Sequence, residues 1–201
     1  MRTINEILKM FPWTQKGDWN KHENGGGWVQ ITARADTSAR IEGIVSGNAW
    51  VFGTARVSGN AWVFGTARVS GDAWVFGTAQ VSGNARVSGD AWVFGTAQVS
   101  GNARVSGNAW VFGTARVSGD AWVSGDARVS GDAWDRSPLQ IQGTMHFATN
   151  CKFGHISIGC EVHTFAEWKS NYKTIGAEHG YTDEQIKEYK AIIDLFCKIG
   201  R

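Results

Sequence analysis

Hydrophobic and polar residues alternate along most of the chain with a period of six. From Val45 to Trp134 each unit reads Val-x-Gly-x-Ala-x, as in VSGNAW and VFGTAR, and the valine recurs at every sixth position up to Val129. Side chains of an extended chain alternate between two faces, so each valine and its two neighbours fit a short strand with the valine directed inward. A glycine every six residues would cost a helix about 1 kcal/mol at each position. The pattern therefore predicts a β-solenoid of short strands and turns.

A second period, of 18 residues, predicts the size of one coil. The segment 70–87 is repeated without change at 88–105. If three hexapeptides make one triangular coil, residues 18 apart stack about 4.8 Å from one another and form ladders along the axis. Upstream, VQITAR and ADTSAR fit the same frame, which slips by two residues at Ile41–Ile44. Downstream, the frame continues in degraded form to Ile158.

These hexapeptides resemble those of the left-handed parallel β-helix superfamily. In that superfamily an aliphatic residue is followed four positions later by a small residue, as Val45 is by Ala49, although glycine stands here at the third position rather than the second. The resemblance implies an all-β solenoid, a left-handed parallel β-helix with three hexapeptides per coil. It also implies a homotrimer with parallel axes, and the superfamily includes acyltransferases and carbonic anhydrases. The flanking segments GDWNKHENGGGWVQITA and GCEVHTFAEW resemble, more loosely, hexapeptide-repeat proteins of tailed phages.

Short helices are predicted on both sides of the coil. Three capping boxes, each a threonine followed three residues later by Glu or Gln, begin at Thr3, Thr164 and Thr182. We predict an N-terminal helix and capping loop at 1–28, the left-handed β-helix at 29–160, and a C-terminal helical hairpin at 161–201. The last helix has an apolar stripe that needs a packing surface, at Ile186, Tyr189, Ile193 and Phe196.

Sorting the outward residues by 18 predicts three flanks of different chemistry. One flank carries six aromatic residues, named here the aromatic ladder: Trp74, Phe76, Trp92, Phe94, Trp110 and Phe112. A second flank carries the arginine ladder: Arg68, Arg86 and Arg104. The third flank carries mainly glutamine and serine. The first coil departs from this order, because it places Trp50 and Trp62 on the other two flanks.

Both ladders have a structural and a functional interpretation. Six adjacent aromatic side chains reach or exceed the patch of roughly 300–600 Å² that a monomer exposes. A neighbouring copy in a cyclic trimer would cover them, and the alternatives are a stacking platform for a nucleobase-like ligand or coverage by the C-terminal segment. The arginine ladder is either a solvated face that discourages aggregation or a site for phosphate or carboxylate. In a trimer, the arginine ladder of one copy would lie beside the aromatic ladder of the next.

Candidate catalytic chemistry is sparse. Acyltransferases of the resembled superfamily use a histidine as general base beside coenzyme A, and His146, which the frame places on the aromatic flank, is the weak candidate. Residues 45–134 contain no inserted loop to build an acceptor pocket. His146, His155 and His163 lack the arrangement of a three-histidine metal site, and Cys151 falls at an inward position that suits a core thiol. We predict no catalytic residue, no metal and no cofactor; coenzyme A belongs only to the acyltransferase alternative.

Composition restricts the setting. A net charge of +2 indicates no general affinity for nucleic acid or membranes, and no run of 18 apolar residues or secretory signal is present. Three cysteines, Cys151, Cys160 and Cys197, fit free thiols in a reducing cytoplasm. The hypothesis is a cytoplasmic, non-catalytic homotrimeric binding protein that holds an anionic or nucleotide-like ligand. In a phage setting it would sequester a defence signal or block a host defence protein. An acyltransferase and a purely structural spacer are the alternatives.

Overall fold

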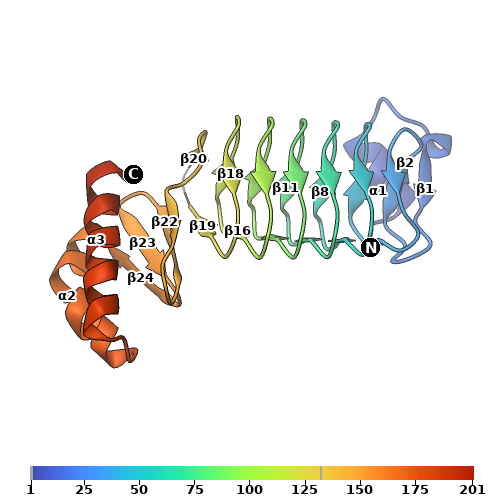
Figure 1. Ribbon diagram of the computed structural model, residues 1–201. Helices are drawn as coiled ribbons and strands as arrows, with labels where there is room; N and C mark the ends of the chain where they lie inside the picture. The colour runs from blue at the N-terminus through green and yellow to red at the C-terminus, as the bar shows by residue number, and fades with distance from the viewer. Residues whose placement is uncertain (1, 132) are drawn as a thin grey trace.

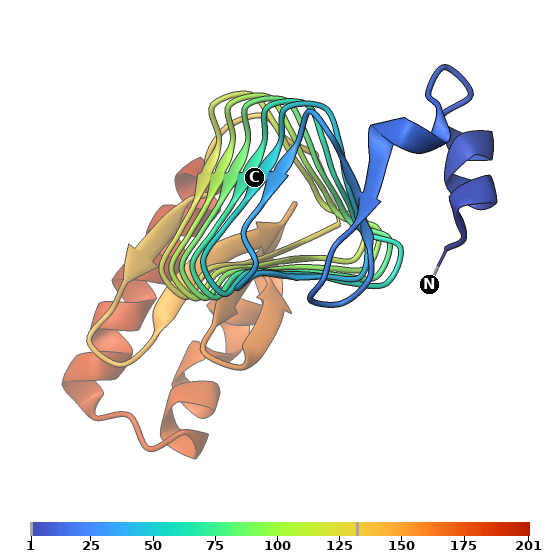
Figure 2. The same cartoon turned by 90° about the vertical axis from the view of Figure 1, so that its right-hand side faces the viewer.

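The computed structural model describes residues 2–131 and 133–201. These residues build an elongated rod, in which an N-terminal cap is followed by a β-solenoid and by a C-terminal cap of antiparallel strands and helices (Figure 1). Seen end-on, the solenoid is triangular (Figure 2). This confirms the predicted parallel β-helix with three hexapeptides per coil. No helix within the described ranges is both long and apolar enough to cross a membrane.

Parallel strands form the three flanks of the coil, and strands 18 residues apart pair in register, as Val75 does with Val93. The aromatic flank contains β4 (Arg40–Ile41), β7 (Arg56–Val57), β10 (Trp74–Val75), β13 (Trp92–Val93), β16 (Trp110–Phe112) and β19 (Arg128–Ser130). The arginine flank contains β3 (Arg34–Ala35), β6 (Trp50–Val51), β9 (Arg68–Val69), β12 (Arg86–Val87), β15 (Arg104–Val105) and β18 (Trp122–Val123). The third flank contains β2 (Trp28–Gln30), β5 (Ile44–Val45), β8 (Trp62–Val63), β11 (Gln80–Val81), β14 (Gln98–Val99), β17 (Arg116–Val117) and β20 (Ala133–Trp134).

Valine and alanine fill the interior of the coil, and their side chains form one continuous buried column. The corners depend on glycine. Gly89 has a φ of +69°, and a Cβ at this position would lie 3.0 Å from the backbone nitrogen of Gly107 in the next coil. Glycine therefore supplies both the left-handed backbone conformation and the close stacking of successive coils.

The N-terminal cap closes one end of the coil. Trp28 pairs with Ile44, 16 residues later, which confirms the predicted slip of two residues in the first coil. β1 (Trp19–Lys21) pairs with β2 in the antiparallel direction and covers the open strand edge, as expected for this segment. Before it lie α1 (Ile4–Met10), which begins at the predicted capping box of Thr3, and the short 3-10 helix η1 (Lys16–Asp18).

The other end of the coil comes earlier than the hexapeptide frame predicts. Trp134 pairs with Val117, so one residue is lost from the 18-residue spacing at the last corner. A slip of one residue turns a side chain to the opposite face of a strand. Trp134 is therefore 1% exposed and closes the valine column, instead of pointing outward. The prediction that the β-helix extends to residue 160 is wrong.

The residues after this plug form an antiparallel sheet covered by two helices. Its strands are β21 (Gln140–Gln142), β22 (Phe147–Lys152), β23 (His155–Ile158) and β24 (Glu161–Thr164). The predicted helical hairpin is confirmed as α2 (Phe165–Glu178) and α3 (Asp183–Ile199), each with its capping box. The stripe residues Tyr189, Ile193 and Phe196 are buried in one cluster with Ile156 of the sheet and Trp168 of α2. The antiparallel sheet and α2 are thus the surface on which the stripe packs.

Candidate functional site

The aromatic ladder lies on one flank in register, as the 18-residue period predicts. Trp92 pairs with Trp74 on one side and Trp110 on the other. The phenyl rings of Phe76 and Phe94 stack with centroids 4.9 Å apart and an interplanar angle of 4°. The tryptophans and phenylalanines of the flank thus form one continuous packed surface along three coils.

The indole rings of this ladder take two orientations, and the residue 16 positions earlier decides which. Trp74 follows Ser58, and its Nε1–H donates to the serine Oγ at 2.9 Å, so its ring stands at 74° to that of Trp92. Trp92 follows Phe76 at the same distance along the chain and lies edge-on to that ring. Trp92 and Trp110 stack in parallel, 5.2 Å apart and at 3°. A hydroxyl in the preceding coil tilts the indole, whereas a phenyl ring leaves it free to stack.

Each ring of the ladder is half-buried by its neighbours, and its outer side stays open. The alternative that the C-terminal segment covers the ladder is wrong, because α2 and α3 pack on the antiparallel sheet beyond the end of the coil (Figure 1). The two other interpretations, a neighbouring copy and a flat ligand, stay open.

The arginine ladder also lies in register along its flank. Arg86 pairs with Arg68 and Arg104, and the three side chains are exposed. Among the described residues none of the three forms an ion pair. Tryptophan stands at both ends of the ladder: the Cζ of Arg68 lies 5.9 Å from the ring of Trp50, and Trp122 follows Arg104 in register.

The aromatic flank has the opposite order. Arg56 precedes Trp74 in the ladder and Arg128 follows Trp110, with the Arg128 Cζ 4.9 Å from the Trp110 ring. In the described coil, the two flanks therefore present one arginine and one tryptophan at each of five successive levels. These level pairs are Trp50 and Arg56, Arg68 and Trp74, Arg86 and Trp92, Arg104 and Trp110, and Trp122 and Arg128. The sequence analysis missed this complementarity, although the residues before each valine, taken in pairs six positions apart, carry it.

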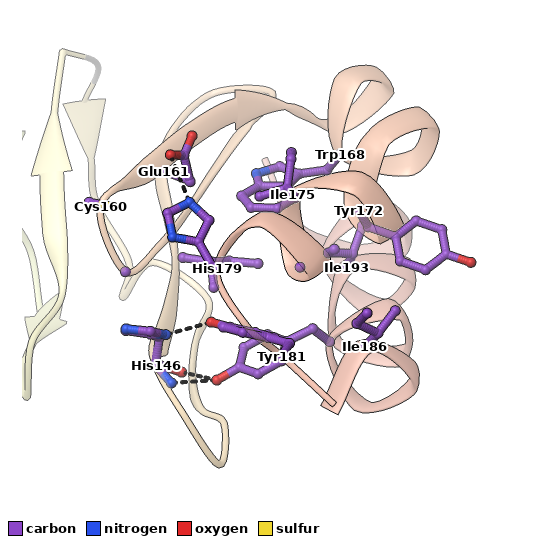
Figure 3. Close-up of a pocket in the computed structure, with 14 residues that line it drawn as sticks. His146, Cys160, Glu161, Trp168, Tyr172, Ile175, His179, Tyr181, Ile186 and Ile193 are labelled. Atoms are coloured by element: carbon purple, nitrogen blue, oxygen red, sulfur yellow. Dashed lines mark hydrogen bonds and ion pairs between the residues drawn. The ribbon is translucent and has the colours of Figure 1, made fainter. Parts of the chain in front are cut away.

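A separate cavity of about 50 Å³ lies in the C-terminal cap (Figure 3). His146 borders it, and its Nδ1 is hydrogen-bonded to the hydroxyl of Tyr181, whose ring stacks on the imidazole. The hydroxyl of Tyr189 donates to the His146 carbonyl at 2.8 Å. The expectation that His146 lies on the aromatic flank is therefore wrong, because the coil ends before it. Burial, together with the nearby phenol of Tyr189, raises the pKa of Tyr181 to about 12.

Polar side chains gather at the mouth of this cavity around Glu161 (Figure 3). Its carboxylate lies 2.7 Å from Nε2 of His163 and 3.2 Å from Nε2 of His179. These two hydrogen bonds, the one to His163 foremost, hold the pKa of Glu161 below its ordinary value. The thiol of Cys160 belongs to the same cluster.

The remaining histidine and cysteine candidates lie apart from this cluster. His155 Nδ1 is 2.9 Å from the carbonyl of Phe153. Cys151 is 4% exposed, as expected for a core thiol, and burial raises its pKa. Cys197 is half-buried, and all three cysteines are free.

Comparison with known proteins finds one match, to the coil. Residues 79–95, 97–113 and 115–131 match a family model described as YdcK Beta solenoid repeat. The three windows begin 18 residues apart, so each repeat of that model corresponds to one coil. No curated protein and no solved structure matches, and the resemblance to phage proteins gains no support. The matched repeats and the three-sided coil together show that this chain is a hexapeptide-repeat protein of the parallel β-solenoid class.

Proposed function

We propose that this chain is a non-catalytic binding protein that assembles as a homotrimer, with the arginine flank of one copy against the aromatic flank of the next. The observation that carries the proposal is the order of the two flanks. At five levels, from Trp50 and Arg56 to Trp122 and Arg128, one flank offers an arginine where the other offers a tryptophan.

A guanidinium over an indole ring is a favourable contact. Such a pair contributes about 0.5–1 kcal/mol at an exposed site and about 2 kcal/mol when it is desolvated. The chain already uses this contact within one flank, where Arg128 lies over Trp110. Placing the two flanks together would repeat it at five levels, cover the aromatic ladder, and separate the stacked arginines from one another.

The order of the residues favours a parallel, cyclic assembly. Because the mating surfaces are two different flanks, each copy has one free surface of each kind, and rotation about an axis closes the ring. An antiparallel dimer through the aromatic flank would place Arg56 against Arg128, and one through the arginine flank would place Arg68 against Arg104. Both contacts bring like charges together. The two flanks meet at the corner 70–73 of a triangular coil, and three copies around an axis near this corner can each touch two neighbours.

The binding part of the proposal concerns the groove at the edge of this contact. Guanidinium N–H donors of Arg68, Arg86 and Arg104 are exposed there beside half-buried ring faces. Forked donors suit phosphate or carboxylate groups, and aromatic faces suit a base. The ligand class that fits both features is a flat anion such as a nucleotide.

An exchange of one level tests the assembly. Light scattering should give three times the chain mass of 21.9 kDa for the native protein. Trp92→Arg places an arginine opposite Arg86 and should dissociate the trimer. The double variant Trp92→Arg with Arg86→Trp gives this level the order already present at Trp50 and Arg56, and it should restore the trimer. Gln98→Arg on the third flank is the matched control. A monomeric native protein, or a double variant no better than Trp92→Arg, would overturn the proposal.

Calorimetry with a panel of nucleotides and cyclic nucleotides tests the ligand. Binding that is lost in Arg86→Gln, while the trimer mass is retained, supports the groove. If no member of the panel binds the trimer, the ligand class is wrong and the assembly stands by itself.

A further inference from the structure

Three side chains with metal-binding atoms meet in the C-terminal cap, at a distance from both ladders. Cys160 and Glu161 stand at the turn between β23 and β24, and His179 is the C-terminal cap residue of α2. Gly159 has a φ of +58°, and a Cβ there would lie 2.9 Å from the His146 ring, so the turn is seated closely against the rest of the cap. The ligands thus come from a tight hairpin and a helix end, both of which are fixed by packing.

The three donor atoms are close enough to share one ion. The Cys160 sulfur, a Glu161 carboxylate oxygen and a His179 ring nitrogen all lie within 4.8 Å of one another. With zinc–ligand bonds of about 2.0–2.3 Å, two ligand atoms of a tetrahedral ion lie about 3.3–3.8 Å apart. The Nε2 of His179 and the Oε1 of Glu161, at 3.2 Å, already have nearly this separation. A shift of the exposed thiol by a rotation of its side chain would complete the set.

The two oxygens of Glu161 have different roles in this arrangement. Oε2 is held by His163 at 2.7 Å, while Oε1 faces His179. A carboxylate ligand whose second oxygen is anchored by a hydrogen bond keeps its orientation toward the ion. His163 itself packs edge-on against the ring of Trp168, with centroids 5.1 Å apart, and so serves as a positioning residue.

From this geometry we propose that Cys160, Glu161 and His179 bind a divalent transition-metal ion, Zn²⁺ in particular. A thiolate and an imidazole favour zinc over Mg²⁺ or Ca²⁺, which select oxygen ligands. The thiolate and the carboxylate together balance the charge of the ion. Three protein ligands leave a fourth position on a tetrahedral ion, and the three residues line the same cavity as His146 and Tyr181 (Figure 3).

The metal alone is the probe for this site. The full-length protein, freed of metal by a chelator, should take up one Zn²⁺ per chain in calorimetry at neutral pH. With Co²⁺ in place of zinc it should show the thiolate-to-cobalt charge-transfer band in the near ultraviolet. Cys160→Ser should abolish this band, and His179→Ala should weaken Zn²⁺ binding at least tenfold. His163→Ala should keep the band and weaken binding by about 10–100-fold, the effect expected for an orienting partner.

Matched controls separate this site from other thiols and histidines. Cys197→Ser and His155→Ala change residues outside the cluster and should leave both the band and the affinity unchanged. Far-ultraviolet circular dichroism of each variant should match the native protein, because Cys160 is exposed and its replacement by serine removes no core packing. A native chain that takes up no Zn²⁺, or a cobalt band that persists in Cys160→Ser, would overturn the proposal. Neither result bears on the trimer, whose contacts lie on the coil.

Discussion

The same seven residues, AWVFGTA, meet two different environments in this molecule. At 61–67 the motif places Trp62 on the third flank, where the N-terminal cap covers it: the ring of Phe11 lies 5.1 Å from Trp62 and 5.0 Å from Trp19. At 91–97 the same motif places Trp92 in the aromatic ladder, where only its neighbours in the ladder cover it. The hexapeptide sets the flank and direction of a tryptophan. A distant segment of chain decides whether that tryptophan becomes core or surface.

The length of the covering element explains why one site is closed and the other is not. α1 has 7 residues and spans about 10 Å, the distance of roughly two coils. This is enough to cover one exceptional tryptophan near the end of the rod. The ladder runs along three coils, and a surface of that length suits another rod with the same spacing. That geometric match is why we assign the second copy to the ladder.

The largest effect is expected where the covered cluster is broken. Phe11→Ala removes a ring that is 4% exposed and should lower the free energy of unfolding by about 3–5 kcal/mol, as for other large-to-small changes in a core. Chemical denaturation followed by circular dichroism measures it. Trp13→Ala, two residues later and at a side chain 78% exposed, is the control and should change stability by less than about 0.5 kcal/mol. Equal effects of the two changes would show that α1 does not seal Trp62.

A smaller effect is expected in the ladder, and it should depend on protein concentration. Trp92→Ala removes one parallel stack and several edge contacts, each worth about 0.5–1.5 kcal/mol, from a half-buried ring. At concentrations where single copies dominate, we expect a loss of about 1–2 kcal/mol. The difference from the native protein should grow as the concentration rises, because only the native ladder gains a partner. The loss caused by Phe11→Ala should stay constant over the same range. A constant difference for Trp92→Ala would remove the ladder from the interface.

The smallest effect is expected from the hydroxyl that tilts Trp74. Ser58→Ala removes the acceptor of its indole N–H and should cost about 0.5–1 kcal/mol. The freed ring can then turn toward the parallel arrangement of Trp92 and Trp110, which near-ultraviolet circular dichroism should register. Ser82, at the equivalent outward position of the third flank, has no tryptophan 16 residues later, so Ser82→Ala should change neither signal. If both variants behave alike, the hydrogen bond does not set the tilt.

The sequence by itself determined the solenoid and the composition of its flanks. A contact between stacked coils always joins residues 18 apart, so a ladder such as Trp74, Trp92 and Trp110 can be found by counting. The capping boxes are equally local, because Thr3, Thr164 and Thr182 each bond within three residues. Where a contact has a fixed and short separation along the chain, the pattern of residues is sufficient to predict it.

Only the tertiary structure decided where the coil ends, what covers Trp62, and which side chains meet in the cap. Trp134 fits the hexapeptide frame by sequence, yet the loss of one residue at the last corner turns it inward. His146 meets Tyr181 across 35 residues, and Glu161 meets His179 across 18 residues that form a helix rather than a coil. Contacts of this kind depend on how whole elements pack. No repeat encodes their separation, and a one-residue change in register redirects every side chain that follows.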